Sequence, residues 1–297
     1  MTQLVATLIA PPGNASKLTD AIAVCADFLN DTRIAELAFE RAVDIHFDTE
    51  KDLSSIRPHL QRLIADLPVD IAVQPAEGRR KKLLIADMDS TIIGQECIDE
   101  LADFAGLKPQ VSAITERAMR GEIEFEPALR ERVALLKGLP VETIDRVIAE
   151  RIRLTGGAKT LVATMRANGA RAILVSGGFT AFVEPVAAMA AFNESYANHL
   201  IESDGLLTGE VTDPILGRSA KLAMLEDAII RFGLSATDTL AVGDGANDLA
   251  MIARAGLGIA YHAKPKVAEA ADARIDHNDL IGLLFAQGYR PEEFVTS

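Results

Sequence analysis

The chain has 297 residues, of which 49% are hydrophobic and 25% are charged, a composition typical of a globular protein of about two domains. Its 30 basic and 43 acidic residues give a net charge of −13, and such a chain would be repelled by a phosphate backbone or an anionic membrane. These numbers exclude a wholly disordered chain, collagen-like and mucin-like proteins and disulfide-rich mini-proteins. They also argue against nucleic acid or a membrane as a partner.

The cysteines and the apolar runs predict where the protein resides. Both cysteines, Cys25 and Cys97, lie within apolar helical patterns, where a thiol behaves as a small hydrophobic side chain. The apolar run 4–10 lacks the positive flank and cleavage pattern of a signal peptide. The longest nearly uncharged stretch, 172–192, is interrupted by Ser-Gly-Gly and by Glu184, which argues against a membrane helix. We therefore predict a cytoplasmic protein without a membrane span.

Residues 4–76 alternate between strand and helix patterns. Short or alternating apolar runs predict strands, and apolar residues three and four positions apart predict helices. The expected elements are, in chain order, a strand at 4–10, a helix at 18–28, strands at 35–40 and 41–48, a helix at 53–67 and a strand at 69–73. This βαββαβ order predicts a ferredoxin-like α+β domain at 1–77. The element order resembles that of ACT-like domains, and we expect a separable regulatory unit or the contact of a homodimer.

The segment between this domain and the rest of the chain is polar. Residues 74–80 contain Pro75 and Gly78, which makes them the best candidate for a linker. The basic run 79–82 follows directly. In an acidic protein we expect it to be solvated linker charge rather than a targeting signal or a phosphate-binding patch.

From residue 78 onward the pattern is that of an α/β domain, 78–297. Short apolar runs at 83–86, 172–175, 239–242 and 257–260 are separated by helical patterns and predict the buried parallel strands of a Rossmann-like sheet. The helical stretch 95–155 is too long for a simple crossover, so we expect an inserted helical cap between two parts of the core, 78–94 and 156–297. Apolar runs at 196–200 and 206–212, on either side of an Asp-Gly turn, predict a hairpin.

Two carboxylates follow the first of these strands. Asp87 and Asp89 stand directly after the run 83–86, at the carboxyl edge of a parallel sheet where ligands bind. Two acids at this place require a cation. An EF-hand loop is excluded because Ile92 and Ile98 occupy the positions where that loop needs Gly and Glu.

A second acidic motif, Gly-Asp-Gly-Ala-Asn-Asp at 243–248, follows another predicted strand. A dinucleotide fingerprint needs Gly where Asp248 stands, and the Lys-Ser/Thr of a P-loop is absent. Nucleotide binding is therefore not expected. The two glycines allow a tight turn, so that Asp244 can reach a metal held by the first acids.

Two further features are weak when taken alone. Ser176, Gly177 and Gly178 follow a strand, and their hydroxyl and backbone N–H groups can bind a phosphate oxygen, although such a sequence is usually an ordinary turn. Lys221 lies near the start of a predicted helix, where a single lysine is usually a solvated charge.

Together these motifs resemble those of the haloacid dehalogenase superfamily of phosphatases. In chain order they are Asp87-x-Asp89-x-Thr91, Ser176, Lys221 and Gly243-Asp244-x-x-Asn247-Asp248. The segment 87–96, then Met119, Phe125 and the run 129–140, resemble the corresponding parts of the phosphoserine phosphatase family within that superfamily. The resemblance covers residues 83 to about 275.

The resemblance implies a Mg2+-dependent reaction. Asp87 would be the nucleophile that forms an aspartyl-phosphate, and Asp89 would be the general acid and then the general base. The Mg2+ would be held by the carboxylates of Asp87 and Asp244 and by the backbone carbonyl of Asp89.

The phosphate group would be held by a second set of residues. These are Ser176, Gly177, Lys221 and Asn247, which would hydrogen-bond to or neutralise the phosphoryl oxygens. Asp248 would orient Lys221.

Two cap residues would recognise an amino acid. Glu96 would pair with its ammonium group, and Arg132 would bind its carboxylate as a two-point fork; the alternative is an ordinary ion pair on a helix surface. Met119 and Phe125 would form an apolar lid, or else belong to the core of the cap.

The implied reaction is hydrolysis of O-phosphoserine to serine and phosphate, the last step of serine synthesis. Alternatives are a transferase that moves the phosphoryl group to another alcohol, a phosphatase for another small phosphomonoester, or a non-catalytic amino-acid-sensing module.

Overall fold

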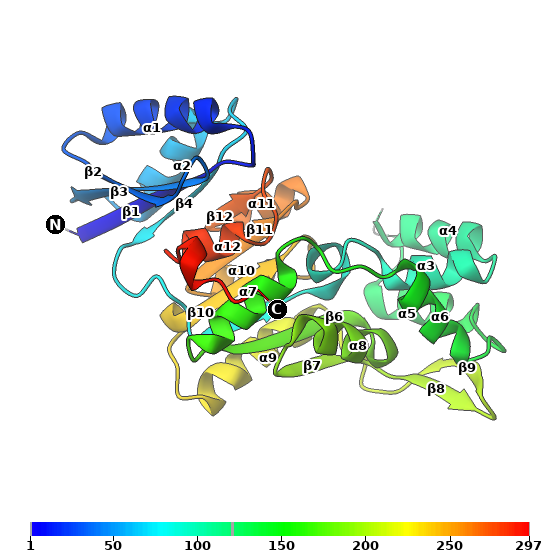
Figure 1. Cartoon of the computed structure of the whole chain (residues 1–297). Helices are drawn as coiled ribbons and strands as arrows, with labels where there is room; N and C mark the ends of the chain where they lie inside the picture. The colour runs from blue at the N-terminus through cyan, green and yellow to red at the C-terminus, as the bar shows by residue number, and fades with distance from the viewer. Residues whose placement is uncertain (1, 120–121, 297) are drawn as a thin grey trace.

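The structure is a computed structural model that describes residues 2–119 and 122–296. For Met119 and Arg218 it describes the backbone alone. The chain forms an N-terminal domain, a central core and a cap at the end of the core away from that domain (Figure 1). Within the described residues no helix combines the length and the apolar character needed to cross a membrane.

The N-terminal domain has the predicted βαββαβ order. Its elements are β1 (Thr2–Ile9), α1 (Ala15–Leu29), β2 (Arg33–Ala38), β3 (Ala42–Thr49), α2 (Leu53–Leu63) and β4 (Asp70–Pro75). The strands pair antiparallel in the order β2-β3-β1-β4. Because side chains alternate along a strand, Leu4 and Leu8 of β1 face the helices and share a core with Leu18 and Leu60. The second helix ends at Leu63, four residues before the predicted end.

The core sheet contains the four predicted parallel strands and two more. Its strands are β5 (Leu83–Ala86), β6 (Arg171–Phe179), β7 (Glu194–Asn198), β10 (Thr239–Gly243), β11 (Leu257–Tyr261) and β12 (Ala273–Ile275). They pair in the order β12-β11-β10-β5-β6-β7, and all these pairs are parallel. The fold class predicted from the sequence, a Rossmann-like α/β core with a helical cap, is confirmed.

Helices cover both faces of this sheet. Their bounds are α7 (Ala158–Ala167), α8 (Thr180–Ala190), α9 (Arg218–Arg231), α10 (Leu249–Arg254), α11 (Pro265–Ala270) and α12 (Gly282–Ala286). Leu84 of β5 packs in one hydrophobic cluster with α7, α8 and α12, whereas Leu83 and Ile85 pack in another with α9, α10 and α11. Burial on both faces explains why these strands are uninterrupted apolar runs.

The sheet of the N-terminal domain and the sheet of the core are joined into a single sheet. Strand β12 pairs antiparallel with β4, with Ala273 opposite Ala72, so that ten strands form a continuous sheet. The predicted linker at 74–80 is therefore wrong at its start: Gln74 lies buried in β4 and donates a hydrogen bond of 2.7 Å to the carbonyl of Ala286 in α12.

The basic run 79–82 is also not simply solvated charge. Arg79 forms an ion pair with Asp44 of β3, and Lys81 is buried, with its backbone N–H bound to Gln287. The other two members, Arg80 and Lys82, are largely exposed. The segment helps to hold the N-terminal domain on the core, because the side chains of Arg79 and Lys81 point into the protein.

The segment 95–155, for which a helical cap was expected, is helical, with four helices among its described residues. They are α3 (Cys97–Phe104), α4 (Lys108–Met119), α5 (Phe125–Ala134) and α6 (Glu142–Arg151). A two-stranded hairpin, β8 (Leu200–Ser203) and β9 (Leu206–Val211), joins them, and the backbone of Leu207 bonds to Gly138 and Leu139. The predicted first strand of the hairpin, 196–200, was wrong: 194–198 is β7 of the main sheet, and the hairpin begins at Leu200.

Candidate active site

The site lies at the carboxyl ends of the parallel strands, below the cap. A cavity of about 170 Å³ opens there between core and cap. The residues that line it are Asp87, Asp89, Glu96, Cys97, Ile98, Phe125, Leu129, Arg132, Ser176, Gly177, Gly178, Phe179, Asp244, Gly245, Asn247 and Lys264. The tertiary fold thus brings eight of the predicted substrate, metal and catalytic residues to one cavity, with Lys221 buried behind it. Phe125 lines it as well.

Asp87 and Lys221 form the buried centre of the site. Asp87 follows β5, and its carboxylate accepts a bond of 2.7 Å from Lys221 Nζ, which also lies 2.6 Å from Asp248. Burial works to lower the pKa of Lys221, but Asp87 and Asp248 outweigh it and raise that pKa, so the lysine stays charged. Burial and then repulsion from Asp248 raise the pKa of Asp87, against the effect of Lys221.

The tight turn after β10 depends on Gly243. A Cβ at this position would overlap the carboxylate of Asp248, so the glycine lets that carboxylate fold back beneath the strand end. Asp248 then accepts from the Gly245 N–H at 3.0 Å and from Lys221. This is the orienting contact to Lys221 that the sequence predicted.

Asp89 is held by two hydrogen bonds. Its Oδ1 accepts from the backbone N–H of Cys97 at 2.8 Å, and its Oδ2 accepts from Ser176 Oγ at 3.1 Å. Burial raises its pKa, and these bonds oppose that rise. A carboxyl group with a raised pKa, facing the cavity, suits proton transfer to and from a substrate oxygen.

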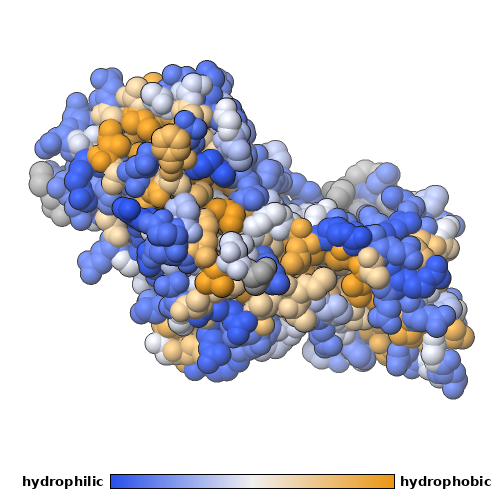
Figure 2. Space-filling model, viewed as in Figure 1, coloured by the Kyte–Doolittle hydropathy of each residue, from blue (hydrophilic) through white to orange (hydrophobic). Residues whose placement is uncertain are grey.

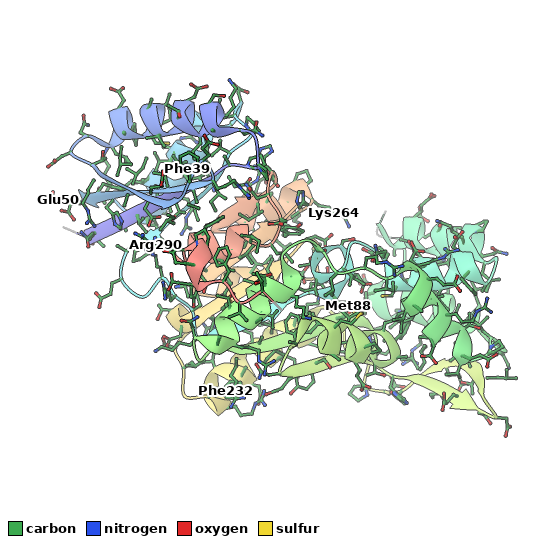
Figure 3. All side chains as sticks on the ribbon, in the orientation of Figure 1. Phe39, Glu50, Met88, Phe232, Lys264 and Arg290 are labelled. Carbon is green, nitrogen blue, oxygen red and sulfur yellow. The ribbon has the colours of Figure 1, made fainter. Side chains whose placement is uncertain are left out.

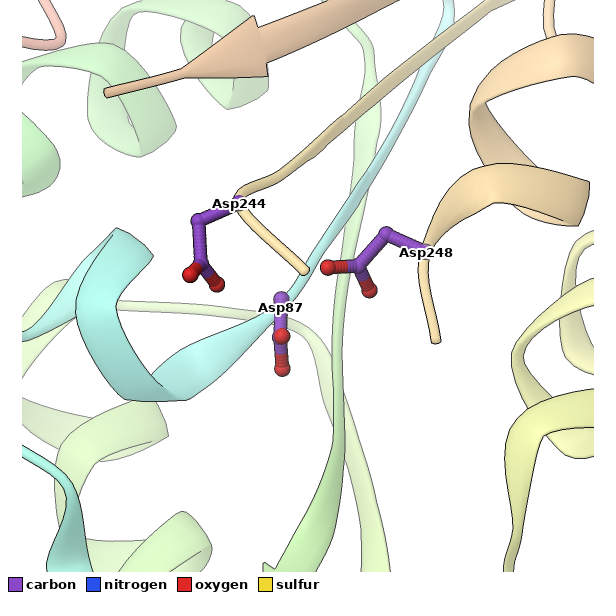
Figure 4. Close-up of side chains that lie close together, drawn as sticks. All are labelled: Asp87, Asp244 and Asp248. Atoms are coloured by element: carbon purple, nitrogen blue, oxygen red, sulfur yellow. The ribbon is translucent and has the colours of Figure 1, made fainter. Parts of the chain in front are cut away.

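Three carboxylates are arranged so that a cation fits. Oxygens of Asp87, Asp244 and Asp248 lie within 4.8 Å of one another (Figure 4). Carboxylate oxygens are the ligands that hard divalent cations prefer. The side chain of Asp89 is not part of this cluster. Both oxygens of Asp248 are engaged, Oδ1 by Lys221 and Oδ2 by the Gly245 N–H, whereas Lys221 and the Met88 N–H both bind Asp87 at Oδ1. Asp87 and Asp244 are therefore the carboxylates best placed to hold a metal.

The cap side of the cavity carries the opposite pair of charges. Glu96 accepts a bond of 2.7 Å from Ser90 Oγ, and burial together with the charge of Asp89 raises its pKa to about 7. Arg132, on α5, is partly buried, and this burial lowers its pKa although Asp99 and Glu96 oppose the change. Among the described residues, Glu96 and Arg132 do not form an ion pair with each other.

The other predicted residues surround the phosphate side and the lid. Ser176 is buried at the end of β6, and Asn247 lines the cavity. A Cβ on Gly177 would lie 3.2 Å from the ring of Phe125, so this ring closes directly over the glycine. The side chain of Met119, predicted to share this lid, lies outside the described residues.

Sequence reasoning missed several lining residues. Cys97, Ile98, Leu129 and Phe179 contribute apolar or backbone surface. Lys264 is the one missed residue with a charge. It follows β11, which was predicted, so the signal that would have found it was its place after the carboxyl end of a fourth parallel strand.

The fold and the site define a class. A parallel sheet has an aspartate pair after β5, a serine in the last part of β6, an acidic turn after β10 and a helical cap above them. A model of the haloacid dehalogenase-like hydrolase family matches residues 84–253. The chain therefore belongs to the haloacid dehalogenase-like hydrolases.

Within this family the chain is similar to enzymes named phosphoserine phosphatase. It is 44% identical over 236 residues to that of Archaeoglobus fulgidus, a match that covers 79% of this chain and 68% of the relative. It is 45% identical over 231 residues to one of Mycobacterium tuberculosis, covering 77% of this chain and 56% of the relative.

Solved structures agree with these relatives. A haloacid dehalogenase family hydrolase of Salmonella enterica serovar Typhi superposes with a TM-score of 0.86 at 29% identity, covering 96% of this chain and 98% of that chain. The shared architecture thus extends over the N-terminal domain. A substrate-bound phosphoserine phosphatase superposes with a TM-score of 0.64 at 42% identity, covering 69% of this chain and 97% of that one.

Proposed function

We propose that the protein hydrolyses O-phospho-L-serine to L-serine and phosphate with Mg2+, as the last step of serine synthesis. The observation that carries this proposal is that Glu96 and Arg132 line the same cavity as Asp87 and Asp89. A general phosphatase needs only the second pair. A carboxylate and a guanidinium on the wall of one cavity suit a ligand with an ammonium and a carboxylate.

The proposed first step forms an aspartyl-phosphate. A carboxylate oxygen of Asp87 attacks phosphorus, and the bond between phosphorus and the serine oxygen breaks. Asp89 gives its proton to the departing oxygen. In the second step Asp89 takes a proton from water, whose oxygen attacks phosphorus and releases phosphate and the Asp87 carboxylate. The raised pKa of Asp89 supports its role as the acid.

Neighbouring groups stabilise the charge on the phosphoryl oxygens. Lys221 lies 2.7 Å from Asp87, so it is placed beside the attacked phosphorus. Ser176, the Gly177 N–H and Asn247 surround the same end of the cavity. In a site shielded from water such fixed donors stabilise developing charge strongly.

The residues present fit Mg2+. Asp87, Asp244 and the Asp89 carbonyl would hold it, and when bound it would neutralise the charge of phosphate and nucleophile so that two anions can meet. The support for this is the carboxylate cluster and the acidic turn that positions Asp244.

Phosphate release from a panel of esters tests the proposal. We expect rapid release from O-phospho-L-serine, slow release from phenyl phosphate, and loss of both after chelation of Mg2+. Equal rates on both esters would contradict the proposed specificity and would indicate a phosphatase for another small phosphomonoester. Formation of a phosphorylated alcohol in the presence of homoserine, without free phosphate, would favour the transferase alternative. Serine binding without any turnover would favour the sensing module.

We further propose that residues 1–77 form a domain that joins two copies of the chain in the cytoplasm. Strand β2 is a free edge of the sheet, and Ile34 and Phe39 beside it are 51% and 75% exposed. Figure 2 shows hydrophobic residues grouped over this domain. Two free, buried cysteines are consistent with a reducing compartment. In light scattering, Phe39→Asp should reduce a dimer to a monomer, and Ile230→Asp, equally exposed on α9, should not.

A further inference from the structure

The negative charge of the cavity opposes binding of a phosphate ester, the ligand proposed for it. Four carboxylates line it: Asp87, Asp89, Glu96 and Asp244. The whole chain also carries a net charge of −13. A phosphate monoester is a dianion near neutral pH, so both the protein and the cavity wall repel it before any contact is made. Mg2+ and Lys221 would offset this repulsion once the phosphate is bound, and a cation at the entrance would offset it while the phosphate approaches.

Most cations of the site are already committed. Lys221 is buried and bound to both Asp87 and Asp248. Arg132 Nε donates to a backbone carbonyl, and this residue stands on the cap, where an amino-acid carboxylate would bind. Among residues 2–119 and 122–296, Lys264 has no carboxylate within ion-pair distance of its ammonium group, unlike Lys221. It stands on the core beside Asp244, unlike Arg132.

The backbone holds Lys264 at the edge of the site. It comes directly before α11, and Pro265 is the first residue of that helix. Its N–H donates to the carbonyl of the metal-site residue Asp244 at 3.2 Å, and its own carbonyl accepts from the N–H of Val267 at 2.9 Å. Figure 3 shows Lys264 on the side of the core that faces the cap. The backbone of Lys264 is thus fixed at the cavity wall, and its charged side chain is exposed.

Lys264 lies beside the acidic turn of the site. Lys264 and Asp244 line the same cavity, and their backbones are hydrogen-bonded to each other. A phosphate bound beside Asp244 would therefore lie near the ammonium group of Lys264.

We propose that Lys264 is a substrate-binding residue that draws the phosphate group of the substrate into the cavity and pairs with it there. The inference rests on the proposed function only in requiring a phosphate monoester as the ligand. The role belongs to the phosphate and not to the amino acid, so it is distinct from that of Glu96 and Arg132.

Binding of inorganic phosphate in the presence of Mg2+, measured by calorimetry, tests this directly. We expect Lys264→Met to weaken binding about three- to tenfold at low salt. Lys264→Arg should restore most of the affinity, because a charge at the same place suffices. Lys266→Met is the matched control, since this exposed lysine lies two residues away and does not line the cavity. The difference should shrink in 0.5 M KCl because salt screens exposed charges.

Kinetics distinguish binding from support of the metal site. In Lys264→Met, KM should rise by a similar factor for phosphoserine and for phenyl phosphate, with kcat nearly unchanged. Unchanged phosphate affinity, or a loss that vanishes when Mg2+ is raised, would overturn the inference. If the wild-type protein binds phosphate but does not hydrolyse phosphoserine, the proposed function fails, and the calorimetry still decides the role of Lys264.

Discussion

Arg79 donates a hydrogen bond of 2.7 Å to Asp44 across the junction between the core and the N-terminal domain. Asp44 is 1% exposed and also accepts from Thr7. The guanidinium lies against Gly288, where a Cβ would overlap it. The N-terminal domain is therefore joined to the core by a buried ion pair as well as by the sheet.

Arg79→Ala should destabilise the protein markedly. The substitution leaves the Asp44 carboxylate buried without its cation, a change that costs about 3 to 5 kcal/mol of the free energy of unfolding. Urea denaturation measures this. Lys17→Ala removes an exposed ion pair with Asp20 in the same domain, so it should cost about 1 kcal/mol or less. Similar losses in both variants would show that the junction contributes little.

Asp87→Asn should abolish turnover while the fold persists. The amide retains the shape of the carboxylate but is neither a nucleophile nor a good ligand for Mg2+. We expect kcat to fall by at least about a thousandfold, with the circular dichroism spectrum unchanged. Asp145→Asn, on the exposed face of α6, is the control. Near wild-type activity in Asp87→Asn would contradict the covalent mechanism.

Asp89→Asn should affect substrates according to their leaving groups. Serine leaves as an alcohol and needs a proton, whereas an activated aryl oxygen leaves without one. The loss of kcat should therefore be largest for phosphoserine and smallest for p-nitrophenyl phosphate. Equal losses would argue that Asp89 does not act as the acid.

Arg132→Ala should change specificity rather than phosphoryl chemistry. Loss of a charge-assisted hydrogen bond is worth about 1.5 to 3 kcal/mol, or roughly 10- to 150-fold in kcat/KM for phosphoserine. Arg132→Lys should lie between alanine and wild type, because it restores charge without the two-point grip. Glu96→Gln should likewise act on phosphoserine alone. Parallel losses on phenyl phosphate would mean that these residues support the cap or the metal site.

The pKa of Glu96, raised to about 7 by burial and Asp89, predicts a pH dependence of specificity. The ionised form pairs with an ammonium, and its fraction grows as the pH rises through 7. The ratio of kcat/KM for phosphoserine to that for phenyl phosphate should rise about tenfold between pH 6 and pH 8, since kcat/KM reports groups of the free enzyme. Ionisation of the phosphate is common to both esters and cancels in the ratio. Glu96→Gln should remove this dependence, and a flat ratio in wild type would refute it.

Patterns that lie within one element were predicted well. The four buried parallel strands are uninterrupted apolar runs, so they were recognised, whereas β12 has three residues and β7 is half-exposed. The first strand of the hairpin was misplaced for the same reason, because β7 and β8 adjoin and neither has a clear apolar pattern. Lys264 was missed because a single lysine in a sequence does not indicate a binding site. Its place near the site becomes clear only when β11, which precedes it, is placed in the sheet.

The sequence by itself determined which chemical groups gather at the site. Carboxylates, glycines and a serine directly after apolar strands specify one edge of a sheet, because parallel strands all present their carboxyl ends there. Only the tertiary structure decided which charged side chains form ion pairs, because the partners lie far apart in the sequence. Lys221 is 134 residues from Asp87, and Arg79 binds a strand 35 residues earlier in the chain. The tertiary structure also decided that the two sheets join through β4 and β12. Two edge strands pair through their backbones once the domains dock against each other, and this pairing does not depend on the identity of their side chains.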